Sequence, residues 1–437
     1  MPRTPHPART PRDLRTALAL ACTLCAAAHA APRQSEESPI IRRVLVTSGL
    51  QQRLVNIVSM SEQELVARDA STGAPVRVPL SNVRALLPVM LPLGGVSAAG
   101  ARRSDAPSLR RVFLDEPAVA VTTDAQSLPG KPGAGEEVTS PDSLPWRSSS
   151  LGSVTLPLDS LQRLLNRQNT PARAPGTADR VFLRNADVID GFVELVPATQ
   201  GPSISLSVDT GNGHTSTLDW ATIDSVEFAA SPQPSRGAWA WLSDSTAVAV
   251  TALAVTPQGQ MTLSWAHGTL AEPTPATNLW AYAPSREHID ALAARPLVGA
   301  TPGDHRTYAQ PPRDADSTIA PLGAADIEIS GPITAAWDLG PGALRIAGSV
   351  EMAPADRIWG DCVVTLEAVA AGSDAALTAP AKELWSARIN ADKPTATLAA
   401  DLPDPAGAPL LLRVRITDGA NGPVQDRVWL RRVLIER

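Results

Sequence analysis

Side chains that could recognise a polar ligand gather in the short run from Arg357 to Asp361, which brings a guanidinium, an indole and a carboxylate together. A second carboxylate, Asp356, precedes this run. A loop of this composition could hold a cation or a sugar hydroxyl, whereas an Asp–Arg pair at the same place could simply stabilise a turn. The flat ring of Trp359 adds a surface on which the C–H groups of a sugar ring can pack. The run therefore indicates either a binding loop or a stabilised turn.

The segment 418–429 carries a second group of polar side chains. Asp418, Asn421 and Asp426 could bind calcium through their oxygen atoms. The Asp-Gly and Asn-Gly pairs of the same segment are also typical turn formers, which explains these residues with fewer assumptions. We therefore expect no metal and no cofactor, with calcium at these three residues as the weaker alternative.

Tryptophan dominates the aromatic residues, with 10 Trp against 4 Phe and 2 Tyr. Trp337 and Trp385 lie in strand-like segments and are expected in a core. Trp359, beside a glycine, and Trp429, close to an arginine, are expected to be exposed. Flat aromatic faces and planar polar groups are the side chains that suit sugars. The expected ligand-binding residues are accordingly Arg357, Trp359, Asp361 and Trp429.

Motifs for catalysis are missing from the sequence. It contains no G-x-S-x-G, no H-E-x-x-H and no glycine-rich phosphate loop. Cys362 lies in the apolar run Cys362-Val363-Val364, which favours a buried, inert thiol over a nucleophile. The histidines beyond residue 30 are scattered along the chain, at His214, His267, His288 and His305. We therefore expect no catalytic residues and no enzymatic activity.

The segments that would carry these residues are short and alternate between apolar and polar side chains. In Leu412-Arg413-Val414-Arg415-Ile416 the apolar side chains point one way and the arginines the other, as in a sheet with one wet face. Similar segments, separated by Gly-, Pro- and Asp-rich turns, continue from residue 344 to residue 430. This pattern predicts a C-terminal β-sandwich over residues 308–437.

Small β units repeat ahead of this sandwich. A closing phrase, a strand followed by a polar turn and an apolar pair, recurs at residues 78–86, 156–164 and 218–228. It defines repeats at residues 42–87, 111–165 and 180–229, and a degenerate fourth repeat at 238–284. The second repeat is expected to contain an insert at 127–142, and a short helix with a Pro-rich linker is expected at 285–307. The predicted fold is all-β, with tandem small barrels followed by the sandwich.

The N-terminal segment, residues 1–30, has the features of a secretory signal peptide. Four arginines precede an apolar run that is too short for a transmembrane helix, and Ala28-His29-Ala30 fits a signal peptidase site. The chain has a net charge of −6, and loss of this arginine-rich segment would make it more acidic. An acidic chain without a basic stripe is a poor binder of nucleic acid or anionic membranes. We expect a soluble product in the periplasm or outside the cell.

The last third of the chain resembles a known family. The phrases Ile333 to Leu339 (ITAAWDL), Leu344 to Val350 (LRIAGSV) and Arg357 to Asp361 (RIWGD) occur in the order found in the NPCBM, or NEW2, domain. This domain is a carbohydrate-binding module first noted beside glycosidases, and the resemblance implies a galactose-binding-like jelly roll. The upstream repeats are similar to segments found before such domains in large bacterial exported proteins, and they resemble Sm- or SH3-like barrels.

Two functional hypotheses follow. The first is an exported, non-catalytic protein whose C-terminal domain binds a polysaccharide or glycoconjugate. The alternative is a structural or protein-interaction scaffold, with the repeats as the working surface and another exported protein as the partner.

Overall fold

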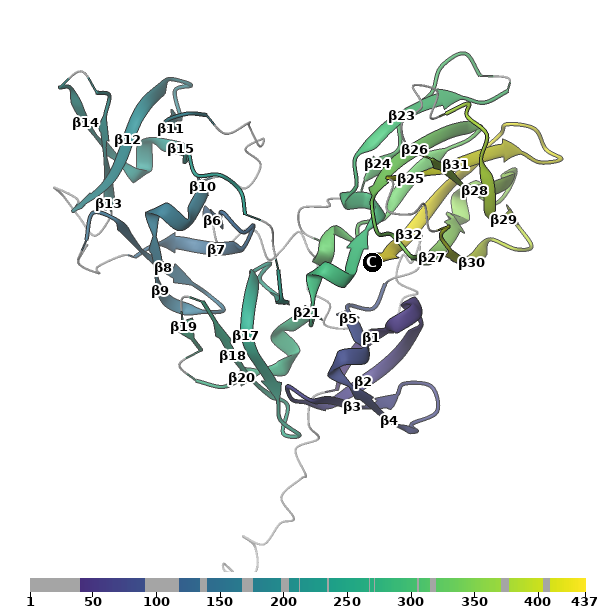
Figure 1. The fold of residues 1–437 in the computed structure, drawn as a ribbon, viewed down its shortest axis with the longest axis horizontal. Helices are drawn as coiled ribbons and strands as arrows, with labels where there is room; N and C mark the ends of the chain where they lie inside the picture. The colour runs from purple at the N-terminus through teal and green to yellow at the C-terminus, as the bar shows by residue number, and fades with distance from the viewer. Residues whose placement is uncertain are drawn as a thin grey trace, which may run out of the picture. The chain divides into compact units, whose positions relative to one another are not determined.

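The computed structural model describes residues 40–90, 118–133, 140–166, 176–197, 204–211, 213–233, 236–266, 268–270, 272–304, 306–314, 320–370, 377–403 and 409–437. The predicted signal peptide, the start of the second repeat, His267 and His305 lie outside these ranges. Within them, all regular structure is β-strand or single-turn 3-10 helix. The predicted fold class, tandem small barrels ahead of a β-sandwich, is confirmed (Figure 1).

The first repeat is a small antiparallel barrel. Its first strand pairs with both the second and the fifth, while the second pairs with the third and the third with the fourth. A 3-10 turn, Leu80–Asn82, connects the last two strands. Because alternate side chains such as Val55 and Ile57 are buried, each strand lines the interior with one face. The strands are β1 (Ile41–Thr47), β2 (Gln52–Met60), β3 (Glu64–Asp69), β4 (Pro75–Pro79) and β5 (Val83–Leu87).

The second repeat has the same order of pairing, including closure of its first strand against its last. A 3-10 turn, Leu158–Ser160, again precedes the last strand. Its strands are β6 (Ala118–Thr122), β7 (Ser127–Pro132), β8 (Ser143–Ser148), β9 (Gly152–Pro157) and β10 (Leu161–Leu165). The expected insert at 127–142 is therefore wrong in its first part, because residues 127–132 form a barrel strand.

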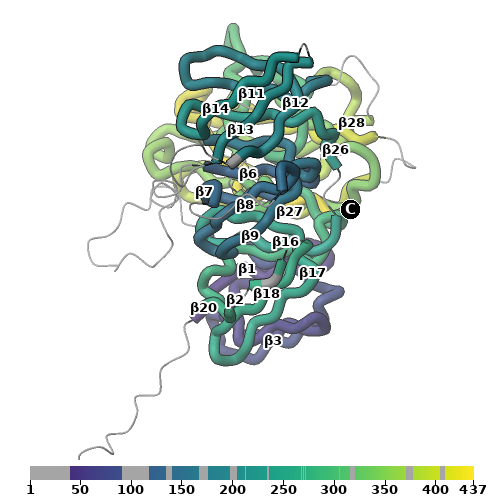
Figure 2. The backbone as a smooth tube through the Cα atoms, turned by 90° about the vertical axis from the view of Figure 1, so that its left-hand side faces the viewer, coloured from purple at the N-terminus to yellow at the C-terminus, as the bar shows by residue number. Residues whose placement is uncertain are grey.

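The third repeat follows the alternation of its sequence. Ile204, Leu206 and Val208 are buried, and Gly211 adopts a φ of 78° in the turn that follows. The pairing pattern and the 3-10 turn, Trp220–Thr222, match those of the first two repeats. The strands are β11 (Asp179–Leu183), β12 (Val188–Pro197), β13 (Ile204–Asp209), β14 (Thr215–Asp219) and β15 (Ile223–Glu227). In Figure 2, β11–β14 lie directly above β6–β9, and the two repeats are joined where β10 pairs with β15.

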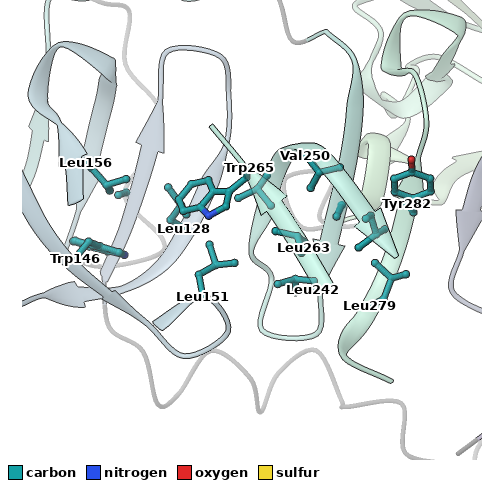
Figure 3. Close-up of a cluster of buried hydrophobic side chains, with 14 of the residues drawn as sticks. Leu128, Trp146, Leu151, Leu156, Leu242, Val250, Leu263, Trp265, Leu279 and Tyr282 are labelled. Carbon is teal, nitrogen blue, oxygen red and sulfur yellow. The ribbon is translucent and has the colours of Figure 1, made fainter. Parts of the chain in front are cut away.

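The fourth repeat keeps the same pairing despite its divergent sequence. The short strand β19 (Gly268–Thr269) additionally pairs with β18. Figure 3 shows side chains of repeats 2 and 4, including Leu128, Trp146, Leu263 and Trp265, within one continuous apolar cluster. The other strands are β16 (Ala238–Leu242), β17 (Ala247–Val255), β18 (Gln260–Trp265), β20 (Thr274–Pro275) and β21 (Leu279–Ala283), with the 3-10 turn Ala276–Asn278.

The C-terminal part is a two-layer β-sandwich (Figure 1). One described sheet has the order β24-β25-β32-β27-β30, with β22 also paired to β32, and the other has the order β23-β26-β31-β28-β29. Trp337, Leu366 and Leu430 belong to the core. The strands are β22 (Ile289–Ala291), β23 (Leu297–Pro302), β24 (Arg313–Asp314), β25 (Ile327–Ser330), β26 (Ile333–Gly340), β27 (Arg345–Met352), β28 (Asp361–Ala370), β29 (Lys382–Asn390), β30 (Thr395–Asp401), β31 (Leu410–Asp418) and β32 (Arg427–Glu436).

The helix and linker expected at 285–307 are replaced by strands of this sandwich. Ile289–Ala291 pairs with the end of β32, and Leu297–Pro302 pairs with β26. Only two 3-10 turns, Arg286–His288 and Leu292–Ala294, are helical in the described residues of this segment. Strand pairing with the sandwich therefore determines the structure of this segment, although the spacing of Ile289 and Leu292 favours a helix.

Repeat 1 also contacts the sandwich directly. An apolar cluster joins Val46 and Leu50 of repeat 1 to Ala347 and Leu434 of the sandwich, together with Trp239 of repeat 4. The Glu436 carboxylate accepts hydrogen bonds from the Gly49 N–H (2.9 Å) and from Arg84 Nε (3.0 Å). A buried apolar contact and charge-assisted hydrogen bonds thus connect the two parts of the fold.

Candidate functional site

The candidate site lies on the connection between β27 and β28. A 3-10 turn, Pro354–Asp356, leads into the tight turn that carries Ile358 and Trp359. The Gly360 N–H donates to the carbonyl of Asp356 (2.9 Å), and a Cβ at Gly360 would lie within 2.6 Å of Asp356 O and Met352 Sδ. A closely packed turn therefore presents the Trp359 side chain, which is 59% exposed, beside Ile358, which is 72% exposed.

Asp356 anchors the start of this turn. Its carboxylate is buried and accepts two hydrogen bonds from Arg427, with Nε–Oδ2 and Nη2–Oδ1 distances of 3.0 and 3.1 Å. Bidentate pairing compensates the burial of the carboxylate. The Asp–Arg pair expected from sequence is thus present, but it ties the turn to β32, 71 residues away, instead of to Arg357.

Asp361 anchors the end of the turn. Arg388 of β29 donates to both carboxylate oxygens, at 2.7 and 2.6 Å, and the Ala420 N–H donates to Oδ2 at 2.8 Å. These hydrogen bonds, chiefly those from Arg388, hold the pKa of Asp361 below its ordinary value. Since the carboxylate is only 3% exposed, its geometry suits loop positioning better than direct contact with a ligand.

The 418–426 loop packs against the tryptophan turn. Asn421 Nδ2 donates to the Trp359 carbonyl (3.0 Å), and Asp426 Oδ1 accepts from the Asp361 N–H (3.1 Å). Burial, together with the nearby carboxylates of Asp418 and Asp361, raises the pKa of Asp426 to about 6. Nowhere among the described residues do three or more histidine, cysteine, aspartate or glutamate side chains meet so that they could hold a metal ion.

Trp429 lies on the outward face of the sheet, where it is half-buried and is the cross-strand neighbour of Glu351. Arg357 belongs to the tryptophan turn, but its guanidinium group reaches back to the end of β27: Nε donates to the Met352 carbonyl (3.1 Å), and Nη2 lies 4.0 Å from Glu351. We call the turn at 354–360 and the 418–426 loop the loop end of the sandwich. Of the four expected ligand-binding residues, Trp359 and Asp361 lie at this loop end, while the side chains of Arg357 and Trp429 lie beside Glu351.

The sequence also predicted that Trp337, Trp385 and Cys362 are buried. Trp337 is buried in the core, whereas Trp385 is only partly buried and donates through Nε1 to the Thr397 carbonyl. Cys362 is fully buried, and burial raises the pKa of its thiol, as expected for an inert cysteine.

Three residues of the loop end were missed from sequence. Ile358 is an exposed apolar neighbour of Trp359, and its position inside a polar turn was the available signal. Arg388 and Arg427 complete the two ion pairs, but they lie 27 and 71 residues from their partners. No local pattern connects residues at such separations.

The fold and loop end together define a class: an all-β chain of small barrels joined to a β-sandwich with an exposed aromatic at one end. No protein-family model matches the sequence, and no curated protein sequence matches it. In the described ranges, no helix has the length and apolar character needed to cross a membrane.

Several solved structures of carbohydrate-binding modules are similar to this chain. The CBM51-2 and INT domains of Clostridium perfringens ZmpB match at 12% identity and a TM-score of 0.24, covering 34% of this chain and 31% of that one. The CBM51 of C. perfringens GH95, in complex with methyl-galactose, matches at 8% identity and 0.24, covering 34% and 99%. The tandem CBM51 modules of Sp3GH98 from Streptococcus pneumoniae match at 10% and 0.25, covering 73% and 87%. The aligned part spans less than a third of the first of these chains.

Proposed function

We propose that this chain is an exported, non-catalytic protein that binds a glycan through the loop end of its C-terminal sandwich. The observation that carries the proposal is the exposed Trp359 ring on a turn that two ion pairs with buried carboxylates hold in place. A pre-positioned aromatic face binds a sugar ring without first losing conformational freedom. The resemblance of residues 308–437 to the NPCBM, or NEW2, domain supports the same ligand class.

A glycan array probed with the full chain tests this function and identifies the ligand. We expect a restricted set of glycans to bind, and we expect Trp359→Ala to lose those signals. Ile358→Ala is the matched control, because it removes the neighbouring exposed apolar side chain from the same turn but leaves the ring. Array binding that survives Trp359→Ala would place the site elsewhere, and an array without signals would contradict glycan binding.

Export is the second part of the proposal, and it rests on the signal-like residues 1–30. N-terminal sequencing of the protein recovered from the periplasm or the medium should yield a chain that begins at Ala31. A product that still begins at Met1 would contradict cleavage.

One observation favours the alternative, an interaction scaffold. Phe192 and Val188 on β12 of repeat 3 are 62% and 50% exposed, and exposed apolar side chains on a regular strand suit contact with another protein. Phe192→Ser should then reduce the recovery of a co-purifying exported protein, whereas equal recovery would remove this support.

A further inference from the structure

A cleft with a mixed polar and apolar lining lies between repeat 1 and the sandwich, away from the tryptophan turn. Residues 49–52 of repeat 1 form one wall, and the outward faces of β27 and β30 form the floor. The cavity has a volume of about 620 Å³, which lies within the range of small-molecule sites in proteins.

The floor of this cleft is flat. Ala347 lies opposite Ala399, and Ser349 lies opposite Thr397, so that small side chains cover two neighbouring strands. Ala347 is buried at the edge of the contact with repeat 1, whereas the other three are half-buried or exposed. Small side chains at these positions leave room above the sheet where larger ones would fill it. The floor therefore offers a shallow, uncharged surface along the strand direction.

Charged side chains lie at both ends of the floor, and each is paired with a side chain of opposite charge. At one end, Arg345 Nε donates to Asp401 Oδ1 at 2.6 Å. At the other end, Arg431 pairs with Asp326 and Glu351. Paired charges do not select an ion of either sign, whereas guanidinium and carboxylate groups still offer hydrogen bonds.

The wall of the cleft is preformed. The Gly49 carbonyl accepts from Arg345 Nη1 (3.1 Å), and the Gly49 N–H donates to Glu436. Gly49 and Leu50 both adopt positive φ, at 73° and 54°, and the exposed Gln51 and Gln52 follow them at the cleft. Each glutamine amide offers both donors and an acceptor, which is the combination that a hydroxyl group requires.

From this combination we propose that the cleft is a second binding site, for a segment of a linear, uncharged polysaccharide. The flat floor accommodates an extended chain, the planar polar groups suit its hydroxyls, and the absence of unpaired charge in the described lining disfavours charged polymers. The proposal goes beyond the site at Trp359 and shares no residue with it.

Calorimetric titration of the full chain with neutral linear hexasaccharides of glucose, xylose, mannose and galactose tests this site. At least one should bind, and Gln52→Ala should weaken that binding roughly fivefold by removing hydrogen bonds. Ala399→Leu should weaken it at least as much, because the larger side chain fills the floor. Gln63→Ala, which removes an exposed glutamine of repeat 1 outside the cleft, should leave the affinity unchanged.

The outcomes separate the two sites. Binding lost in Trp359→Ala but retained in both cleft variants would overturn the cleft proposal and would support the loop site. Binding of none of the hexasaccharides would also overturn it, whatever the glycan array shows. If an extended neutral peptide bound instead, and Gln52→Ala weakened that binding, the cleft would belong to a protein partner and the polysaccharide proposal would be wrong.

Discussion

At the loop end, Asp356 and Asp361 each hold a bidentate arginine, and both carboxylates are almost fully buried. A buried charge is costly unless it is paired, so these residues act on the conformation of the loops. The side chain that they present to solvent is Trp359. Residue types drew attention to these loops from sequence, and burial separates the carboxylates that hold the turn from the Trp359 side chain that faces solvent.

Sequence could predict the exposure of Trp359, because Gly360 beside it marked a tight turn. It could not predict Arg388 and Arg427 as partners, since strand pairing brings them to the turn from distant parts of the chain. It also grouped Trp429 with Trp359, although strand register sets Trp429 beside Glu351.

The carboxyl group of Asp426 is expected to make the stability of the fold depend on pH. Its pKa is raised from 3.8 to about 6 by burial and by the carboxylates of Asp418 and Asp361, against the opposing effects of the hydrogen bond from the Asp361 N–H and of Arg306. The folded state therefore binds this proton more tightly than the unfolded state, so the stabilisation is complete below about pH 4 and is lost as the pH rises through about 6. Asp426→Asn resembles the protonated form and should raise the melting temperature at about pH 7.5 while changing it little at about pH 4.

Thermal unfolding of both proteins at the two pH values checks this prediction. Asp392→Asn, which removes one carboxylate at an exposed position, is the control for the change in net charge. An equal effect of Asp426→Asn at both pH values would mean that the Asp426 carboxyl does not titrate in this range.

At the scale of elements, the sequence predicted strands where apolar and polar residues alternate. The prediction was wrong where prolines and a glycine suggested an insert, and where the spacing of apolar residues suggested a helix. Residues 127–132 contain two prolines and a glycine, yet they form β7. Proline can occupy a strand position whose N–H the ladder does not need, so its presence did not prevent the strand. The spacing of the apolar residues around 289–291 favoured a helix, but this segment pairs with the C-terminal end of β32 instead.

The reassigned strand β22 can be tested through Ile289, which is fully buried. If this segment belongs to the fold core, Ile289→Ala should lower the free energy of unfolding by about 2–5 kcal/mol. Val298→Ala, at a side chain that is 51% exposed, should change it by less than about 0.5 kcal/mol. Urea unfolding measures the free energy of unfolding of both variants. If both substitutions changed it by the same small amount, residues 285–307 would be a linker and not part of the fold core.

At the scale of the whole molecule, repeat 1 and the sandwich share an apolar cluster and the hydrogen bonds of Glu436. Sequence gave no indication of this contact, because Gly49 and Glu436 are separated by 387 residues. The contact also forms one side of the cleft, so the proposed second site depends on it.

Glu436→Gln should weaken this contact by about 1–3 kcal/mol, because it removes the charge that Gly49 and Arg84 bind. Hydrogen–deuterium exchange at the Gly49 amide should become faster as a result. Glu64→Gln, which alters an exposed pair with Arg77 in the same repeat, should leave that exchange unchanged. Unchanged exchange in Glu436→Gln would show that the apolar cluster alone holds the contact.

The central claim, that Trp359 binds a glycan and contributes little to folding, is tested most directly by measuring affinity and melting temperature together in Trp359→Ala. By analogy with aromatic stacking on nucleic acid bases, the lost platform should cost about 1–3 kcal/mol of binding, while the melting temperature should stay at the wild-type value. Trp337→Ala, in the core, should instead lose about 3–5 kcal/mol of stability. A large fall in the melting temperature of Trp359→Ala, or an affinity equal to that of the wild type, would contradict the claim.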